Sequence, residues 1–243
     1  MPMAVTVANA NPYVGTLRLD ALSGVYPGLG GGEFTAVTMS GPSYLSYYNS
    51  AATHADGSYT GFETFCVETG VEFTPGSTYY YTLGLVTQPL SGGGSGSDKA
   101  LTLGAAWLYY EFATGNLANF NYGYGSARKA DDNLLQAAIW ALQGGQTYSG
   151  YPSLSSTEAN NKFFLAALSA VGGSANAEAA YSGTTVQVLQ LWANSNDTGA
   201  VQNQLVLTGT TPPVPHPLPD GGTTLLFLGS ALAGLRALRC KLA

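Results

Sequence analysis

Residues 131–142 read Asp-Asp-Asn-Leu-Leu-Gln-Ala-Ala-Ile-Trp-Ala-Leu, and this stretch decides the fold of the 243-residue chain. Leu135, Ile139 and Leu142 recur at steps of three and four residues, so they line one stripe of a helix. The helix starts at Ser126 or at the first residue of this stretch, and a pair of glycines stops it shortly after Leu142. A helix at this place divides a chain that otherwise favours short strands.

Short runs typical of strands lie on both sides of this helix, separated by Gly, Pro, Ser and Asn. We expect strands at residues 15–19, 33–39, 44–48, 62–73, 77–85, 184–194 and 202–207. Two further helices are predicted over residues 99–113, with Asp98 as the N-cap, and over residues 156–171. The predicted fold class is therefore α+β, a β-sandwich or barrel with a central helical insert.

The composition is typical of an exported protein and argues against a cytosolic helical enzyme. Charged residues make up 9% of the chain, against a usual share of about 25%, while Gly (32) and Tyr (16) are plentiful. Residues 1–222 hold 5 basic and 14 acidic residues, a net charge of −9, and the remaining three basic residues lie in the last eight positions. An acidic body without a basic stripe excludes nucleic acid as the main partner.

The first ten residues, MPMAVTVANA, are apolar and end in Ala8-Asn9-Ala10. This is the small-x-small pattern that signal peptidase cleaves. We interpret residues 1–10 as the remnant of a signal peptide, so that the mature body starts at Asn11. A frayed terminus or a first strand is the alternative interpretation.

The predicted body, residues 11–209, ends where proline becomes frequent, because proline lacks a backbone donor and fixes φ. An apolar run follows over residues 223–235, and extension to Leu242 gives 20 residues, enough for the ~30 Å core of a membrane. We expect a transmembrane helix and basic tail over residues 223–243, with the C-terminus cytoplasmic. The basic residues that flank the membrane are Arg236, Arg239 and Lys241.

A Pro-containing motif, a short apolar helix and a basic end, in this order, resemble the PEP-CTERM class of sorting tails. The motif is closest to the variant Val-Pro-Asp-(Ser/Gly)-Gly, and it lies in a linker of residues 210–222. It stands here as Leu218-Pro219-Asp220-Gly221-Gly222. In that family an exosortase cuts near the motif, which implies release of the body to the cell surface or to an exopolysaccharide matrix. An ordinary tail anchor that stays in the membrane is the alternative.

The sequence contains none of the familiar catalytic signatures. There is no Gly-x-Ser-x-Gly, no phosphate-binding loop, no HExxH and no Cys-x-x-Cys. The two histidines are His54 and His216, and the second lies in the Pro-rich linker. A metal site or catalytic triad would depend on His54 alone, so we expect a protein that is not an enzyme and that holds no metal or other cofactor.

One pair of segments does carry reactive groups: Cys66 within Phe65-Cys66-Val67-Glu68, in a predicted strand, and Gln136 in the helix described above. A Cys in an aromatic-Cys-aliphatic-acid strand, followed by a helix reading Gln-Ala-Ala-Ile-Trp, resembles the thioester domains of Gram-positive surface adhesins. In that family a Cys thiolate attacks a Gln carboxamide and ammonia leaves. The resemblance therefore implies an internal thioester between Cys66 and Gln136.

A thioester survives only where water is excluded until a partner amine or hydroxyl arrives. The sequence positions suggest that aromatic and small residues form the pocket around the bond. These residues are Phe62, Phe65, Ala137 and Trp140. The implied function is covalent, adhesin-like attachment to an extracellular polymer or protein that bears amines or hydroxyls. In the alternative interpretation Cys66 is an inert buried residue and Gln136 lies on the helix surface.

Two other kinds of site remain open. The acidic residues Glu63, Glu68, Glu72, Asp131 and Asp132 could bind Ca²⁺, but no EF-hand spacing supports this and we favour solvated surface charge.

Tyrosines that could stack on sugars make a non-covalent polysaccharide-binding or matrix-structural module the rival function. They are Tyr79, Tyr80, Tyr81, Tyr109, Tyr110, Tyr122 and Tyr124. Consecutive tyrosines in a strand point to opposite faces, so we expect at least half of them to be packed in the core or at an edge.

The sorting hypothesis predicts where the released protein ends. Mass spectrometry of protein released from the cell surface should find C-terminal peptides that end between Leu218 and Gly222, because cleavage near the motif removes the tail. No peptide should contain Cys240. Recovery of an intact Lys241-Leu242-Ala243 end from the released fraction would contradict the hypothesis.

Overall fold

The computed structural model describes seven ranges of the chain: residues 13–21, 31–41, 61–69, 71–85, 100–144, 160–195 and 199–209. The predicted signal-peptide remnant, linker, sorting motif and membrane helix lie outside these ranges, as do His54 and the strand expected at residues 44–48. Within the described ranges, no helix is long and apolar enough to cross a membrane.

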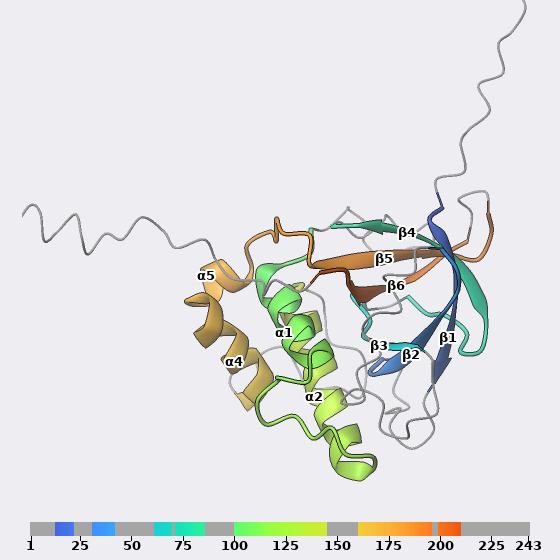
Figure 1. The fold of residues 1–243 in the computed structure, drawn as a ribbon. Coiled ribbons are helices and arrows are strands. Elements are labelled where there is room, and N and C mark those ends of the chain that lie inside the picture. The colour runs from blue at the N-terminus through green and yellow to red at the C-terminus, as the bar shows by residue number, and fades with distance from the viewer. Residues whose placement is uncertain are drawn as a thin grey trace, which may run out of the picture.

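Six antiparallel strands form one curled sheet in the order β3-β2-β1-β4-β5-β6 (Figure 1). They are β1 (Gly15–Ala21), β2 (Phe34–Ser40), β3 (Phe62–Thr64), β4 (Thr78–Gly84), β5 (Val186–Trp192) and β6 (Ala200–Leu207). Side chains alternate between the two faces of a strand, and alternate residues such as Leu17 and Leu19 of β1 pack with Tyr79 and Tyr81 of β4. The described strands thus form a single sheet and not the two facing sheets of a sandwich.

The two ends of this sheet are joined by the residues that follow β3. Cys66 forms a bridge with Gln204 of β6, and the N–H of Val67 donates to the carbonyl of Asn203 at 3.0 Å. The N–H of Leu205 donates in turn to the carbonyl of Phe65 at 3.1 Å. The curl of the sheet therefore brings its first and last strands together at Cys66.

The helices are inserted between β4 and β5, and in Figure 1 they gather on one side of the sheet. They are α1 (Leu103–Ala113), α2 (Ser126–Leu142), α4 (Lys162–Val171) and α5 (Ser174–Ala177). Their apolar residues, such as Phe112 and Phe163, share one buried cluster with Val188 of β5 and Leu205 of β6. The predicted α+β class is confirmed.

Two predicted elements are wrong in extent. The first helix begins at Leu103, because residues 100–102 are extended: the N–H of Leu101 donates to the carbonyl of Leu85, and the carbonyl of Leu101 accepts from Tyr181. Thr102 is the N-cap in place of Asp98, which lies outside the described residues. The strand expected at residues 62–73 ends at Thr64, since the chain then leaves β2 and pairs with β6.

A buried ion pair fastens α2 to the start of β2. Arg128 donates from Nε to Oε2 of Glu33 at 2.7 Å and from Nη2 to Oε1, and neither side chain is exposed. Asp132, one turn along α2, is also buried. Burial, and then the charge of Glu33, raises the pKa of Asp132 to about 11, so this carboxyl is protonated at neutral pH.

Glu63 is buried as well, where its carboxylate accepts from the hydroxyl of Thr35 at 3.1 Å. The expectation of solvated charge is therefore wrong for Glu63, Asp131 and Asp132, all of which are buried. Arg128 interacts electrostatically with Glu33, Glu63 and Asp132, so one guanidinium is the counter-charge for several buried carboxyl groups. No group of three or more His, Cys, Asp or Glu side chains in the described part of the chain could hold a metal ion.

Removal of the guanidinium of Arg128 should destabilise the fold far more than replacement of the Asp132 carboxyl by an amide. Arg128→Met should lower the free energy of unfolding by about 3–5 kcal/mol, because it leaves buried carboxylates without a counter-charge. Asp132→Asn should change it by no more than about 1 kcal/mol, because a neutral amide replaces a protonated carboxyl. Urea unfolding of both variants checks this, and equal losses would refute the assignment of the buried charge.

Candidate functional site

The side chain of Cys66 is fully buried and lies between amide groups of β6. Its Sγ donates a hydrogen bond to Oε1 of Gln202 at 3.0 Å, and Nε2 of Gln204 donates to Sγ at 3.4 Å. Both glutamines face the thiol because the segment around Cys66 pairs with β6. The polar surroundings of the sulfur are therefore neutral carboxamides.

Helix α2 brings Gln136 to the same place, although 70 residues separate it from Cys66. The side chain is buried; Oε1 accepts from the backbone N–H of Cys66 and of Gly32, each at 3.0 Å. Its Nε2 donates to the carbonyl of Cys66 at 2.8 Å. The structure thus places the Gln136 carboxamide directly against the backbone of Cys66.

Two backbone donors converge on the carboxamide oxygen of Gln136. Two N–H groups aimed at one carbonyl oxygen polarise the C=O bond and are placed to stabilise negative charge that develops on that oxygen. The same two N–H groups, of Gly32 and Cys66, also lower the pKa of the Cys66 thiol in part. The carboxamide oxygen is therefore held by the backbone of the residue that carries the thiol.

The thiol is neutral in this environment. Burial raises the pKa of Cys66 far above its ordinary value, and the hydrogen bond from Gln204 lowers it only in part. The negative charge of Glu68 raises it further. A neutral thiol fits the S–H donation to Gln202, and it makes Cys66 inert toward reagents that need an accessible thiolate.

An aromatic and aliphatic wall surrounds the site. Cys66 packs with Phe34, Ala137 and Trp140, each less than 2% exposed. Trp140 follows Gln136 by one turn of α2, so both side chains lie on the same face of the helix. This wall shields the sulfur and the carboxamide from water.

Two predicted pocket residues lie elsewhere. Phe65 packs edge-on against Phe112 of the helical core at 4.9 Å, and Phe62 belongs to the core inside the sheet. Alternation along the extended chain points Phe65, the neighbour of Cys66, away from the thiol, whereas Phe62 lies four residues earlier in β3 and packs in a separate cluster. Ala137 and Trp140 belong to the same buried cluster as Cys66.

A glycine pair allows the chain before β2 to lie on α2. A Cβ atom at Gly31 would be 2.5 Å from Cη2 of Trp140 and 3.2 Å from Cγ of Gln136, so no side chain fits there. Gly32 has φ +123°, a conformation that glycine adopts without strain, and it turns its N–H toward Gln136. Close approach at Gly31 therefore delivers the donor of Gly32.

Sequence reasoning missed the residues that complete the site: Gly31, Gly32, Phe34, Gln202 and Gln204. The signal for the two glutamines is the polar run in β6, since polar side chains in a strand bounded by apolar residues indicate buried partners. No comparable signal marks the backbone donor of Gly32, because every residue except proline has an N–H.

Glu68 is anchored beside the site by β6. Its carboxylate accepts from the backbone N–H of Asn203 at 2.9 Å and from Nδ2 of the same residue. Burial raises the pKa of Glu68 to about 7, although these hydrogen bonds to Asn203 oppose the shift. Glu72 and Asp131 are not gathered with it, and Asp131 pairs with Lys162.

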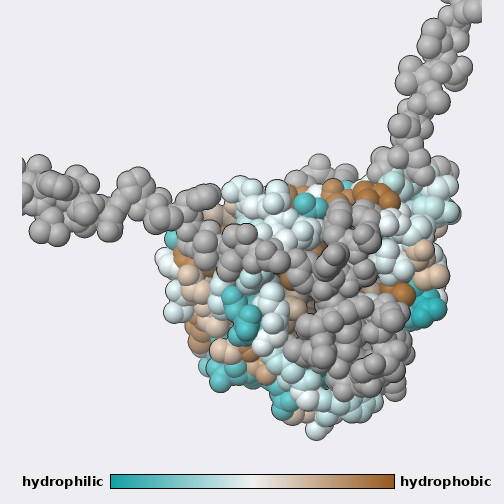
Figure 2. All heavy atoms as spheres, in the orientation of Figure 1, coloured by the Kyte–Doolittle hydropathy of each residue, from teal (hydrophilic) through white to brown (hydrophobic). Residues whose placement is uncertain are grey.

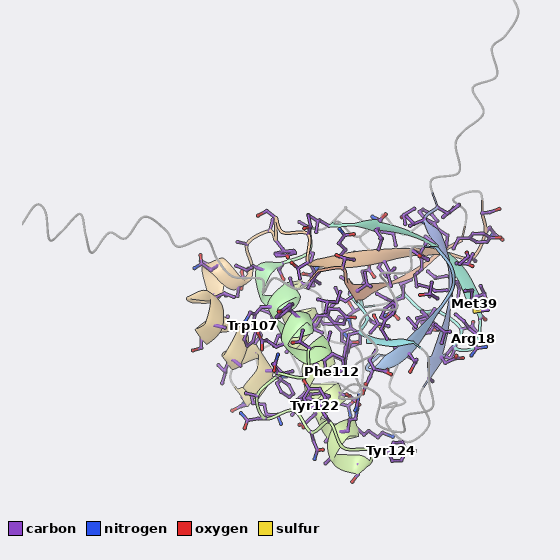
Figure 3. The ribbon with its side chains drawn as sticks, viewed as in Figure 1. Arg18, Met39, Trp107, Phe112, Tyr122 and Tyr124 are labelled. Carbon is purple, nitrogen blue, oxygen red and sulfur yellow. The ribbon has the colours of Figure 1, made fainter. Side chains whose placement is uncertain are left out.

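The tyrosines are mostly packed. Tyr79, Tyr81, Tyr109 and Tyr110 are buried, while Tyr80 and Tyr122 are partly buried. Figure 3 shows Tyr122 next to Phe112, on which it stacks at 6.0 Å, and Tyr124 at the outer end of the helical region.

Tyr124 is 56% exposed and is the one exposed tyrosine of this set. On the face seen in Figure 2, the hydrophobic residues of the described part form small separate groups among hydrophilic ones.

Comparisons of the chain with protein-family models, curated proteins and solved structures found no match. The geometry around Cys66 and Gln136 is therefore the basis for a functional proposal.

The raised pKa of Glu68 predicts a pH-dependent stability. Between the ordinary value of 4.5 and about 7, the folded protein binds more protons at Glu68 than the unfolded chain does, so the free energy of unfolding falls as pH rises through this window. For this partly exposed group we expect a fall of about 1–2 kcal/mol. Urea unfolding at pH 4.5 to 7.5 should show the fall in the difference between wild type and Glu68→Gln; a constant difference would contradict it.

Proposed function

We propose that this chain is an exported surface or matrix protein whose body forms an internal thioester between Sγ of Cys66 and Cδ of Gln136. Through this bond it attaches covalently to amine or hydroxyl groups of an extracellular polymer or protein. The observation that supports the proposal best is the bridge from the Gln136 carboxamide to the backbone of Cys66 and Gly32. The curled sheet joined at Cys66 would then be a thioester-domain-like barrel.

Formation of the bond requires no outside reagent. The sulfur of Cys66 attacks Cδ of Gln136, and the carboxamide oxygen carries negative charge while it is held by the N–H groups of Gly32 and Cys66. The C–N bond then breaks, the thiol proton ends on the nitrogen, and ammonia leaves. The products are one thioester and one ammonia, so atoms and charge balance.

In the attachment step the sulfur of Cys66 is the leaving group, whereas in bond formation it is the nucleophile. A primary amine of the partner attacks Cδ of Gln136, the C–S bond breaks, the Cys66 thiol is restored, and an amide joins the two molecules. A hydroxyl would give an ester in the same way. Each molecule reacts once, so the proposal describes an adhesin and not an enzyme.

The wall of Phe34, Ala137 and Trp140 supports the lifetime that such a bond needs. A thioester exposed to water hydrolyses, whereas one enclosed by these buried side chains meets few water molecules.

Export and processing are proposed from the two ends of the sequence. The signal-peptide remnant and the motif at Pro219, Asp220 and Gly221 support delivery by an exosortase to the cell surface or the matrix. Before cleavage, the C-terminal helix would hold the protein in the membrane.

A non-covalent polysaccharide-binding module has less support. Four of the seven tyrosines proposed for stacking are buried, which leaves Tyr124 as the principal exposed ring among them. One exposed ring offers little surface for reversible binding of a sugar chain.

Intact mass measurement tests the proposal directly. The wild-type chain should be lighter than its sequence mass by one ammonia, and methylamine should convert it to a species one methylene heavier than the sequence mass. Cys66→Ala and Gln136→Ala should both abolish the deficit and the incorporation of methylamine, since each removes one half of the bond. Gln143→Ala is the matched control. Gln143 is a buried glutamine at the end of α2 whose Oε1 accepts from the backbone N–H of Thr102, so its replacement should leave the one-ammonia mass deficit unchanged.

A wild-type mass equal to the sequence mass, together with a Cys66 that is alkylated after mild denaturation, would refute the thioester. Reversible retention on polysaccharide, lost on substitution of Tyr124, would then favour the non-covalent module.

A further inference from the structure

The carboxamide that lies against the sulfur of Cys66 is that of Gln202, in β6. The S–H of Cys66 donates to Oε1 of Gln202 at 3.0 Å. Nε2 of Gln202 donates to the backbone carbonyl of Glu68 at 2.8 Å. This second hydrogen bond fixes the orientation of the carboxamide, because its nitrogen turns toward Glu68 and its oxygen toward the thiol. The carbonyl carbon of Gln202 is therefore one bond away from the atom that the thiol contacts.

The pairing of the chain after β3 with β6 sets this contact. Cys66 forms a bridge with Gln204, and the N–H of Val67 donates to the carbonyl of Asn203 at 3.0 Å. Gln202 and Gln204 are two residues apart in a strand, so both side chains lie on the same face of β6. Gln202 is the diagonal neighbour of Cys66 across the paired segments. Backbone hydrogen bonds thus place this carboxamide against the sulfur.

The carboxamide of Gln136 is held by the main chain instead. Its Oε1 accepts from the N–H groups of Gly32 and Cys66, and its Nε2 donates to the carbonyl of Cys66. The side-chain hydrogen bonds of the sulfur are formed with Gln202 and Gln204. Gln136 therefore fixes the backbone of the residue that carries the thiol, while β6 contacts the thiol itself.

The two glutamines of β6 present different ends to the sulfur. Gln204 presents its nitrogen, since Nε2 donates to Sγ at 3.4 Å, whereas Gln202 presents its oxygen at 3.0 Å. In an attack on a carboxamide the thiol proton leaves the sulfur and ends on the departing nitrogen. The S–H of Cys66 already points to the carboxamide of Gln202, so the direction of the proton favours Gln202 as the group attacked.

The surroundings of Gln202 are also more exposed than those of Gln136. Gln202 is 2% exposed and follows two partly exposed residues at the start of β6, and Glu68, whose carbonyl it binds, is partly exposed as well. Gln136 is 0% exposed, as are its neighbours Leu135 and Ala137 in α2. A partner amine has to reach the acyl carbon, and this requirement fits the position of Gln202.

We infer that the acyl partner of Cys66 is Gln202, so that the thioester joins Sγ of Cys66 to Cδ of Gln202 and links the segment after β3 to β6. This assignment rests on the covalent attachment proposed above and moves the acyl group from α2 to β6. Sγ attacks Cδ, the C–N bond of the carboxamide breaks, the thiol proton ends on the nitrogen, and ammonia leaves. The products are one thioester and one ammonia. Gln136 is then a positioning residue that holds the backbone of Cys66.

The acyl group can be located in the wild-type chain. The full chain is incubated with methylamine, which opens a thioester and leaves an N-methyl amide on the glutamine that formed it. Chymotrypsin cleaves after leucine and tryptophan, so residues 136–140 and residues 193–205 are released in separate peptides. We expect the added methylene in the second peptide, on Gln202, where fragment ions distinguish it from Gln204.

Gln202→Glu tests the assignment by a second route. A carboxylate resists attack by the thiol, so this variant should keep its full sequence mass, incorporate no methylamine and leave Cys66 open to alkylation after mild denaturation. Gln136→Ala does not separate the two partners, because it also removes the acceptor of the Cys66 N–H. The matched control is Gln143→Glu, at another buried glutamine, and it should show the one-ammonia deficit of the wild type.

The outcomes separate this assignment from the function on which it rests. A methyl group on Gln136 or Gln204, or a one-ammonia deficit that persists in Gln202→Glu, overturns the assignment and leaves covalent attachment standing. A wild-type chain that never loses ammonia overturns both. If Gln202→Glu fails to fold by circular dichroism, the location of the methyl group in the wild type decides.

Discussion

The carboxamide of Gln136 is the contact on which the arrangement of the site depends. It joins three segments that are far apart in the chain: helix α2, the glycine before β2 and the residue after β3. A buried carboxamide offers two acceptor positions and two donors, and here both acceptor positions and one donor are used by backbone groups. Any shorter side chain would leave the N–H groups of Gly32 and Cys66 buried without this acceptor. The position therefore requires a side chain with the length and the polar groups of glutamine, whether or not the residue also reacts.

The buried charges belong to the same contact. Glu33 directly follows Gly32, and Arg128, which binds Glu33, lies two turns before Gln136 on α2. The ion pair between Arg128 and Glu33 thus holds the chain at Gly31 and Gly32 against α2. The close packing of Gly31 on Trp140 holds the same segment at a second point. Ion pairs of this kind are expensive to bury and are weak evidence for stability. Their effect here is geometric, because they determine where the N–H of Gly32 points.

The sequence was most informative where structure is local. The extent of α2 could be predicted because its apolar period and the glycines after it are properties of the segment itself. The start of the first helix could not, since residues 100–102 are held extended by Leu85 and Tyr181 from distant parts of the chain. The proximity of Cys66 and Gln136 followed from a resemblance between motifs, and spacing alone would not have suggested it. Gln202, Gln204 and Gly32 were missed because their roles depend on how the ends of the sheet meet.

Burial at this site has opposite effects on making and keeping the proposed bond. It raises the pKa of Cys66, so the resting sulfur is a neutral thiol and a poor nucleophile. It also excludes the water that would destroy a thioester. An accessible site with a low thiol pKa would form the bond readily and lose it as readily. In a buried site the attack must instead be helped by groups that act only as charge develops, and the structure provides them on both reacting partners. Two backbone N–H groups face the carboxamide oxygen and one amide N–H faces the sulfur. Hydrogen bonds, rather than prior ionisation of the thiol, therefore reconcile formation of the bond with its protection.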